Sequence, residues 1–170
     1  ENRDEVEITA DIQDAIAGSL NSKYDLHISR EFTMGRAIKK LGETDLYIYA
    51  EKDGHVTDYA VLENKYIENF TNQYNQLMGY LNPNFEFGIT LSMNREMSLK
   101  KGFDEIENKL KSIKGDFQPI RIQRIGERDT LMITSEHIVP ENGNRMKVFH
   151  MIFQLNDKER KEAAASARKR

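Results

Sequence analysis

The strongest constraint on the fold is a nearly continuous apolar segment at residues 85–93, FEFGITLSM. Strands that are buried on both faces of a sheet have this composition, whereas strands with one solvated face alternate apolar and polar side chains. Residues 69–81 precede it with apolar side chains at helical spacing, and Asn82-Pro83-Asn84 ends that helix. An apolar run at 59–67 comes before the helix. This order predicts a helical crossover between two strands of one sheet.

The rest of the chain extends this pattern. Residues 5–20 place apolar side chains at steps of four and predict an amphipathic helix that ends at 21–23, and residues 99–112 predict another helix. Asp53-Gly54 is a hairpin signal. The other predicted strands are 26–34, 46–50, 120–125, 130–136 and 147–155. We therefore expect an α/β fold in which helices flank a mixed central sheet that is antiparallel at its start.

Composition limits the class of protein. A chain of 170 residues with 38% hydrophobic and 31% charged residues is globular and has room for one domain, which we place at 1–156. Residues 157–170 form a charged, Ala-rich extension or linker. The absence of Cys excludes disulfides, Cys-ligated metals and a thiol nucleophile. No apolar run is long enough to span a membrane, no signal peptide is present, and the first residue is Glu1. These features predict a cytoplasmic piece of a longer protein.

The charge balance does not by itself indicate nucleic-acid binding, because the net charge is −3. Basic residues do cluster locally, and such patches bind phosphates even on a slightly acidic protein, although a solvated surface is their commoner role. The clusters are Arg36, Lys39 and Lys40; Lys100 and Lys101; Lys109, Lys111 and Lys114; and Arg121, Arg124 and Arg128.

The most informative residues are three charged side chains in predicted strands. Asp45 begins the second strand, and Glu63 and Lys65 lie two apart in the third, so these two face the same way. Burying charges inside a sheet is unfavourable unless they pair or bind a metal. Two carboxylates at one edge suit Mg²⁺, and a neighbouring Lys can orient or deprotonate a water for attack on phosphorus. A surface ion pair is the structural alternative.

The register of the hairpin decides whether the three side chains meet. If Lys52 and His55 pair around a two-residue turn, Asp45 lies opposite Leu62 and faces away from Glu63. A three-residue loop, or a β-bulge that restores the register, instead sets Asp45 opposite Glu63. A catalytic site therefore requires one of these two devices.

These residues resemble the motif of the PD-(D/E)xK nuclease superfamily, whose members have the restriction-endonuclease-like fold. Asp45 matches the Asp of the second strand and Glu63-Asn64-Lys65 matches E-x-K, while Thr44 replaces the family's Pro. Gln76 and Tyr80 are similar to the Q-x-x-x-Y motif of RecB-like members. The resemblance implies a three-layer core, a further metal-binding Glu from the first helix, for which Glu5 is the choice and Glu7 the alternative, and supporting roles for Gln76 and Tyr80.

The same resemblance implies an Mg²⁺-dependent deoxyribonuclease in which Mn²⁺ can substitute. It also suggests the effector domain of a larger antiviral defence protein, attached covalently or non-covalently to a sensor module, and is compatible with a homodimer and with no membrane partner. A catalytically idle nuclease fold used for nucleic-acid or protein binding, and an RNA-directed nuclease, remain alternatives. The four histidines, at 27, 55, 137 and 150, lack metal-ligand spacing, so we expect satisfied or exposed rings.

Overall fold

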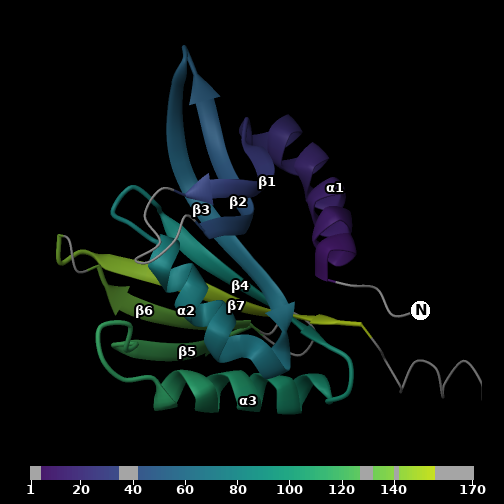
Figure 1. The fold of residues 1–170 in the computed structure, drawn as a ribbon, viewed down its shortest axis with the longest axis vertical. Coiled ribbons are helices and arrows are strands. Elements are labelled where there is room, and N and C mark those ends of the chain that lie inside the picture. Colours follow the sequence, from purple (N-terminus) through teal and green to yellow (C-terminus); the bar gives the residue numbers. More distant parts are fainter. Residues whose placement is uncertain (1–4, 35–41, 127–131, 140–141, 156–170) are drawn as a thin grey trace, which may run out of the picture.

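A computed structural model describes residues 5–34, 42–126, 132–139 and 142–155; the side chains of 5, 31–34 and 42–43 lie outside the description. These ranges form one seven-stranded sheet in the order β1-β2-β3-β4-β7-β6-β5 (Figure 1). The elements are α1 (Glu5–Tyr24), β1 (His27–Met34), β2 (Gly42–Lys52), β3 (His55–Tyr66), the short 3₁₀ helix η1 (Ile67–Asn69), α2 (Phe70–Tyr80), β4 (Phe87–Asn94), α3 (Leu99–Ser112), β5 (Arg121–Ile125), β6 (Met132–Ile138) and β7 (Arg145–Gln154).

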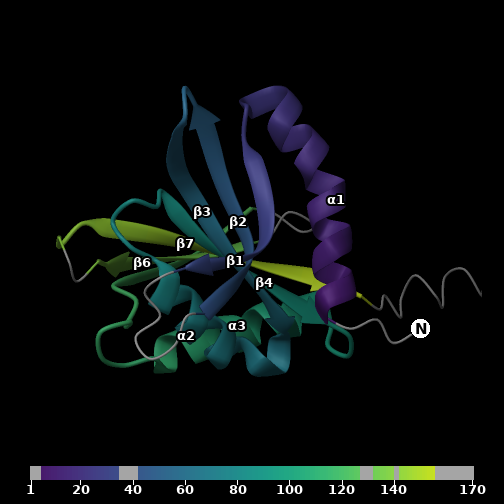
Figure 2. The same ribbon diagram turned by 45° about the horizontal axis from the view of Figure 1, so that its top comes forward.

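Helices pack on both faces of the sheet, with α2 and α3 on one face and α1 on the other, over β1, β2 and β3, so this end of the sheet has three layers. Successive side chains of a strand point to opposite faces. In β3, Val61 packs into the larger apolar core with residues of α2 and α3. Leu62 packs into a smaller core with Leu46 and Leu91, against which Ile12 of α1 lies. Accordingly, α2 and α3 lie together on one side of the sheet and α1 runs beside β1 (Figure 2).

The expected mixed α/β architecture is confirmed. β1, β2 and β3 are antiparallel, and α2 then crosses over so that β4 lies parallel to β3. β4 is also parallel to β7, so the apolar segment is paired on both edges, and it is buried on both faces from Thr90 to Asn94. The helix at 99–112 has the expected bounds. None of the described helices is both long enough and apolar enough to cross a membrane.

The main differences from the predicted boundaries lie in the first helix and the first hairpin. The first helix continues through Tyr24 instead of ending at 21–23, and Asp25 then turns the chain with a left-handed φ of 55°. The second and third strands are longer than predicted and form an arm that projects from the body (Figure 1). The arm's tip is exposed on both faces, so it carries no apolar alternation from which its length could be read.

A buried polar chain crosses the larger core. We call it the histidine network, and it consists of Tyr74, Thr90, Ser135, His137 and His150. Ser135 Oγ lies 2.7 Å from Nε2 of both histidines, Thr90 Oγ1 lies 2.8 Å from Nδ1 of His150, and Tyr74 Oη lies 3.1 Å from Nδ1 of His137. The Tyr74 hydroxyl donates to the backbone carbonyl of Phe117. The expectation of satisfied core histidines is confirmed for these two.

Donor and acceptor roles fix the direction of this network. Because Tyr74 donates to a carbonyl, it accepts from Nδ1–H of His137, which leaves Nε2 of His137 as an acceptor. Ser135 donates to that nitrogen and accepts from Nε2–H of His150, whose Nδ1 accepts from Thr90. These roles hold for neutral rings, the form that burial favours, and they make the two rings opposite tautomers. Burial favours the neutral form and lowers the pKa of His137 to about 4 and that of His150 to about 3.

Candidate functional site

The hairpin contains the bulge that brings Asp45 and Glu63 to the same face. The turn itself has two residues, and both Asp53 (φ 52°) and Gly54 (φ 75°) adopt the left-handed backbone of a type I′ turn. Lys52 therefore pairs with His55. A register shift follows between Ile48 and Tyr49, where Ile48 pairs with Ala60 and Tyr49 with Asp58. The sequence allows either a three-residue loop or a β-bulge, and the structure has the bulge.

Beyond the bulge, Leu46 pairs with Leu62, so the next pair sets Asp45 opposite Glu63. Asp45 Oδ2 accepts a hydrogen bond from the backbone N–H of Asn64 over 2.6 Å. This contact fixes one carboxylate against the Glu-x-Lys segment. Lys65 lies two residues after Glu63 and is half-buried. We call Asp45, Glu63 and Lys65 the carboxylate site.

Glu63 is buried with a side chain that its surroundings only partly satisfy. Its exposed fraction is 1%, and Oε1 has no hydrogen-bond partner among the described residues. Burial, and then repulsion from Asp45, raise the pKa of Glu63 from 4.5 to about 8. The positive charge of Lys65 and hydrogen bonds from Asp45 N–H and the Thr44 hydroxyl act in the opposite direction, and they are weaker. At neutral pH Glu63 is therefore mostly protonated, and an added positive charge would favour its ionised form.

A polar groove of about 600 Å³ opens beside Lys65. Its other described lining residues all carry side-chain amides and come from the start and outer face of α2. We call it the amide groove; the amide residues that line it are Asn69, Asn72, Asn75 and Gln76. A substrate in this groove would lie against the Lys65 side chain.

Gln73 ties α2 to the site, and no motif in the sequence pointed to it. Its Nε2 donates to the backbone carbonyls of Glu63 (2.5 Å) and Leu91 (3.0 Å), and its Oε1 accepts from Ser92 Oγ (3.0 Å). It is fully buried. A signal was present, because Gln73 falls within the apolar stripe of α2 between Phe70 and Leu77, where a polar residue needs partners.

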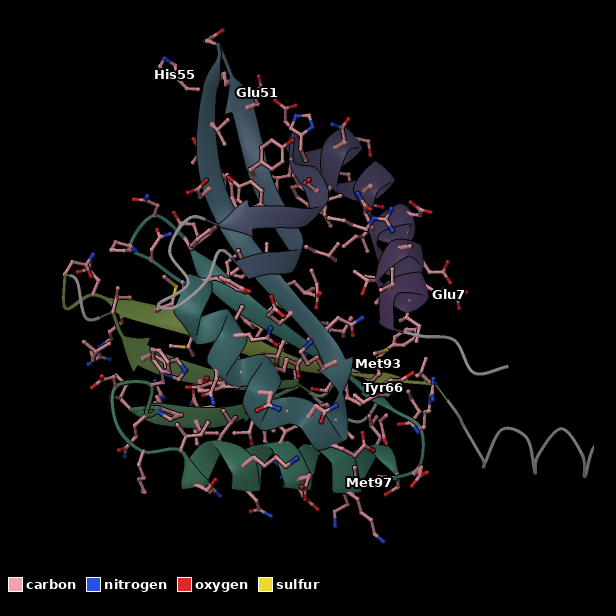
Figure 3. The ribbon with its side chains drawn as sticks, viewed as in Figure 1. Glu7, Glu51, His55, Tyr66, Met93 and Met97 are labelled. Atoms are coloured by element: carbon pink, nitrogen blue, oxygen red, sulfur yellow. The ribbon has the colours of Figure 1, made fainter. Side chains whose placement is uncertain are left out.

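Asn64, the middle residue of the Glu-x-Lys triplet, connects the site to α1. It is buried, and its Nδ2 donates to Thr9 Oγ1 over 2.8 Å. Its Oδ1 has no hydrogen-bond partner in the described part of the chain. Glu5 lies one helical turn before Thr9, but its side chain lies outside the described residues. Glu7, the alternative to Glu5, is exposed, and Figure 3 shows its side chain pointing away from the sheet.

The Q-x-x-x-Y pair is divided between two environments. Gln76 is exposed and lines the amide groove next to Lys65. Tyr80, one turn later, packs in the larger core with Tyr47 and Phe85. The helix thus places Gln76 at the groove, whereas the buried side chain of Tyr80 packs the end of α2 against the core.

The donor chemistry of the carboxylate site fits a hard divalent cation. Mg²⁺ is commonly bound through one or two carboxylates, with water and substrate phosphate as the remaining ligands. Asp45 and Glu63 supply two carboxylates, and Oε1 of Glu63, which has no hydrogen-bond partner in the described structure, is available as a ligand atom. No group of three or more His, Cys, Asp or Glu that could hold a metal occurs among the described residues. A third protein ligand would have to come from outside them, as the prediction for Glu5 requires.

Comparisons with known proteins add no relative. A scan against protein-family models found no match, and searches of curated proteins and of solved structures found none either.

Proposed function

We propose that this protein is a metal-dependent nuclease of the PD-(D/E)xK type that hydrolyses phosphodiester bonds of DNA. The observation that carries the proposal is the buried, partly unsatisfied carboxylate of Glu63 beside Asp45 and Lys65. A stable ion pair or an inert core would not leave a carboxylate oxygen buried without a partner. Perturbed titratable groups that converge beside an open groove are typical of catalytic sites.

Each residue has a distinct role in this proposal. Asp45 and Glu63 would hold Mg²⁺, with Glu5 assisting, and the ion would supply positive charge that polarises the phosphate and favours ionised Glu63. Lys65 orients the attacking water or removes its proton, and its ammonium stabilises the charge that develops on the phosphate oxygens. Attack in line on phosphorus breaks the bond to the 3′ oxygen and leaves a 5′-phosphate and a 3′-hydroxyl. Gln76 contacts the strand beside this point.

The experiment compares the Lys65→Ala variant with Lys114→Ala, which removes an exposed lysine from the loop after α3. Supercoiled plasmid, single-stranded DNA and single-stranded RNA are incubated with each protein, with and without Mg²⁺. We expect Mg²⁺-dependent cleavage of DNA by the wild type and by the Lys114 variant. Loss of the Lys65 ammonium should reduce the rate by at least about 100-fold, because a group that transfers a proton contributes this much.

Calorimetric titration of the same proteins with Mn²⁺ provides the control for metal binding. We expect the wild type and Lys65→Ala to bind the ion, and Asp45→Ala to lose binding. An Asp45→Ala protein that binds Mn²⁺ as well as the wild type, or a Lys65→Ala protein with unchanged cleavage, would contradict the assigned roles. Circular dichroism spectra identical to the wild type show that each variant is folded.

A further inference from the structure

The amide groove has an unusual composition for a surface that would bind a phosphate backbone. Among its described lining residues, Lys65 is the only cation, and the other four carry neutral amides. Proteins that bind duplex DNA through its phosphates place several Lys or Arg side chains along the contact, because each neutralised phosphate releases counterions. Side-chain amides both donate and accept, and they form paired hydrogen bonds with base edges. The groove is therefore suited to bases beside a single neutralised phosphate.

The position of α2 bears on whether those bases belong to a duplex or to a single strand. A helix that reads a duplex must enter the major groove, with its reading face projecting from the protein. α2 instead lies flat on the sheet, and α3 runs next to it (Figure 1). Its apolar side is held by Phe70, Tyr74 and Leu77, all fully buried. The amides therefore line a groove in the surface, and a base can reach them only by entering this groove.

We propose that the amide groove binds unpaired bases of a single strand, adjacent to the phosphate that lies at Lys65. This inference rests on the proposed function for the position of that phosphate. It adds the substrate class, a strand whose base edges are not engaged in a duplex. Asn72 and Asn75 contact the bases, and Lys65 provides the phosphate contact.

Fluorescence anisotropy tests this without any cleavage. A labelled mixed-sequence DNA oligonucleotide of about 20 nucleotides is titrated in EDTA as a single strand and as a duplex, at several salt concentrations. We expect the single strand to bind at least about 10-fold more tightly than the duplex. The slope of log K against log salt should be near −0.7, the value for one phosphate contact on a single strand.

Variants assign the contacts. Asn72→Ala and Asn75→Ala should each weaken single-strand binding by about 5-fold or more with the salt slope unchanged, because each removes hydrogen bonds to a base and leaves the phosphate contact in place. Lys65→Gln should bring the slope toward zero. Asn108→Ala, an exposed amide on α3, is the matched control and should bind like the wild type. Ala is a better helix former than Asn, so weaker binding by these variants does not arise from a weakened helix.

Equal or tighter duplex binding, a slope several times steeper than −0.7, or unchanged binding by both Asn variants would overturn the inference. These outcomes are distinct from failure of the proposed function, which is the absence of Lys65-dependent cleavage. A protein that cleaves plasmid DNA in a Lys65-dependent manner and binds duplex with a steep salt slope would retain the nuclease function and lose the single-strand assignment.

Discussion

The histidine network and the carboxylate site both bury titratable side chains in the same sheet, and His150 and Glu63 are almost equally inaccessible, at 0% and 1% exposure. In the histidine network every ring nitrogen has a hydrogen-bond partner, and the neutral forms that burial favours satisfy all of these hydrogen bonds. In the carboxylate site, burial favours a protonated Glu63, whereas metal binding requires the ionised form. Burial to the same extent therefore agrees with the neutral rings of the histidine network, but it opposes the ionised form of Glu63 that would bind a metal.

The difference shows how burial and hydrogen bonding together separate a structural polar cluster from a candidate functional one. The histidine network connects β4, β6, β7 and α2, and its polar groups need no ligand to complete their hydrogen bonds. The carboxylate site leaves an oxygen buried without a partner among the described residues, an arrangement that proteins retain where function needs it. Substitutions and pH changes in the two clusters should therefore have different effects on stability.

The largest effect should follow from His150→Leu. The substitution removes the ring that links Thr90 to Ser135 and leaves both hydroxyls buried without that partner. We expect the free energy of unfolding to fall by about 3 kcal/mol, since each unsatisfied buried group costs about 1–3 kcal/mol. Urea denaturation at pH 7.5 measures this loss. His55→Leu, at the exposed tip of the hairpin (Figure 3), is the control and should change stability by less than about 0.5 kcal/mol. Equal losses in the two variants would show that the network does not stabilise the fold.

The pH dependence of stability should have two limbs, one for each cluster. The pKa of Glu63 is raised to about 8, so stability falls as pH rises from about 4.5 to 8, where the unfolded chain releases a proton that the folded chain retains. The pKa values of His137 and His150 are lowered to about 4 and 3, so stability falls as pH decreases below about 6.5. Between pH 4.5 and 6.5 these two contributions oppose each other, and the two histidines together outweigh Glu63. We therefore expect a maximum near pH 6.5 and, relative to neutral pH, a loss of about 2 kcal/mol from each histidine at pH 5.

Urea unfolding between pH 5 and 9 measures both limbs. A hydrogen bond with Arg124 lowers the pKa of Asp104, and hydrogen bonds with Lys111 and Arg124 lower that of Glu107, so these partly exposed carboxyl groups titrate below the pH range of the experiment. A profile that stays level from pH 6.5 to 5 would contradict the neutral, buried histidines. A profile that stays level from pH 7 to 9, where the histidine contribution is complete, would contradict the raised pKa of Glu63.

A smaller effect, opposite in sign, is expected from Glu63→Gln. The variant cannot ionise, so it should remove the alkaline limb and raise the free energy of unfolding at pH 8 by about 1–2 kcal/mol in the absence of metal. Thermal melts in EDTA measure the gain, and added Mn²⁺ should stabilise the wild type while leaving the variant unchanged. Glu96→Gln, an exposed carboxylate, should show neither effect. A Glu63→Gln protein that is less stable than the wild type at pH 8 would show that the ionised carboxylate is well satisfied.

The local sequence determined much of this protein. The Asp53-Gly54 turn, the bounds of α3 and the crossover through α2 follow from turn chemistry and from periodicity within about 15 residues. The alternation of β3 also placed Glu63 and Lys65 on one face, and the length of the hairpin showed that Asp45 could join them only through an odd loop or a bulge.

The tertiary structure decided the rest, because those features depend on contacts between residues far apart in the chain. The choice of the bulge, the bonds from Gln73 to two strands, and the link of Asn64 to Thr9 across 55 positions follow from how the sheet packs against α1 and α2. The histidines gave no local signal, since Ser135 and His150 meet only when β6 and β7 pair. Periodicity reports which side of an element is buried; which buried groups find partners is decided by the elements that assemble against them.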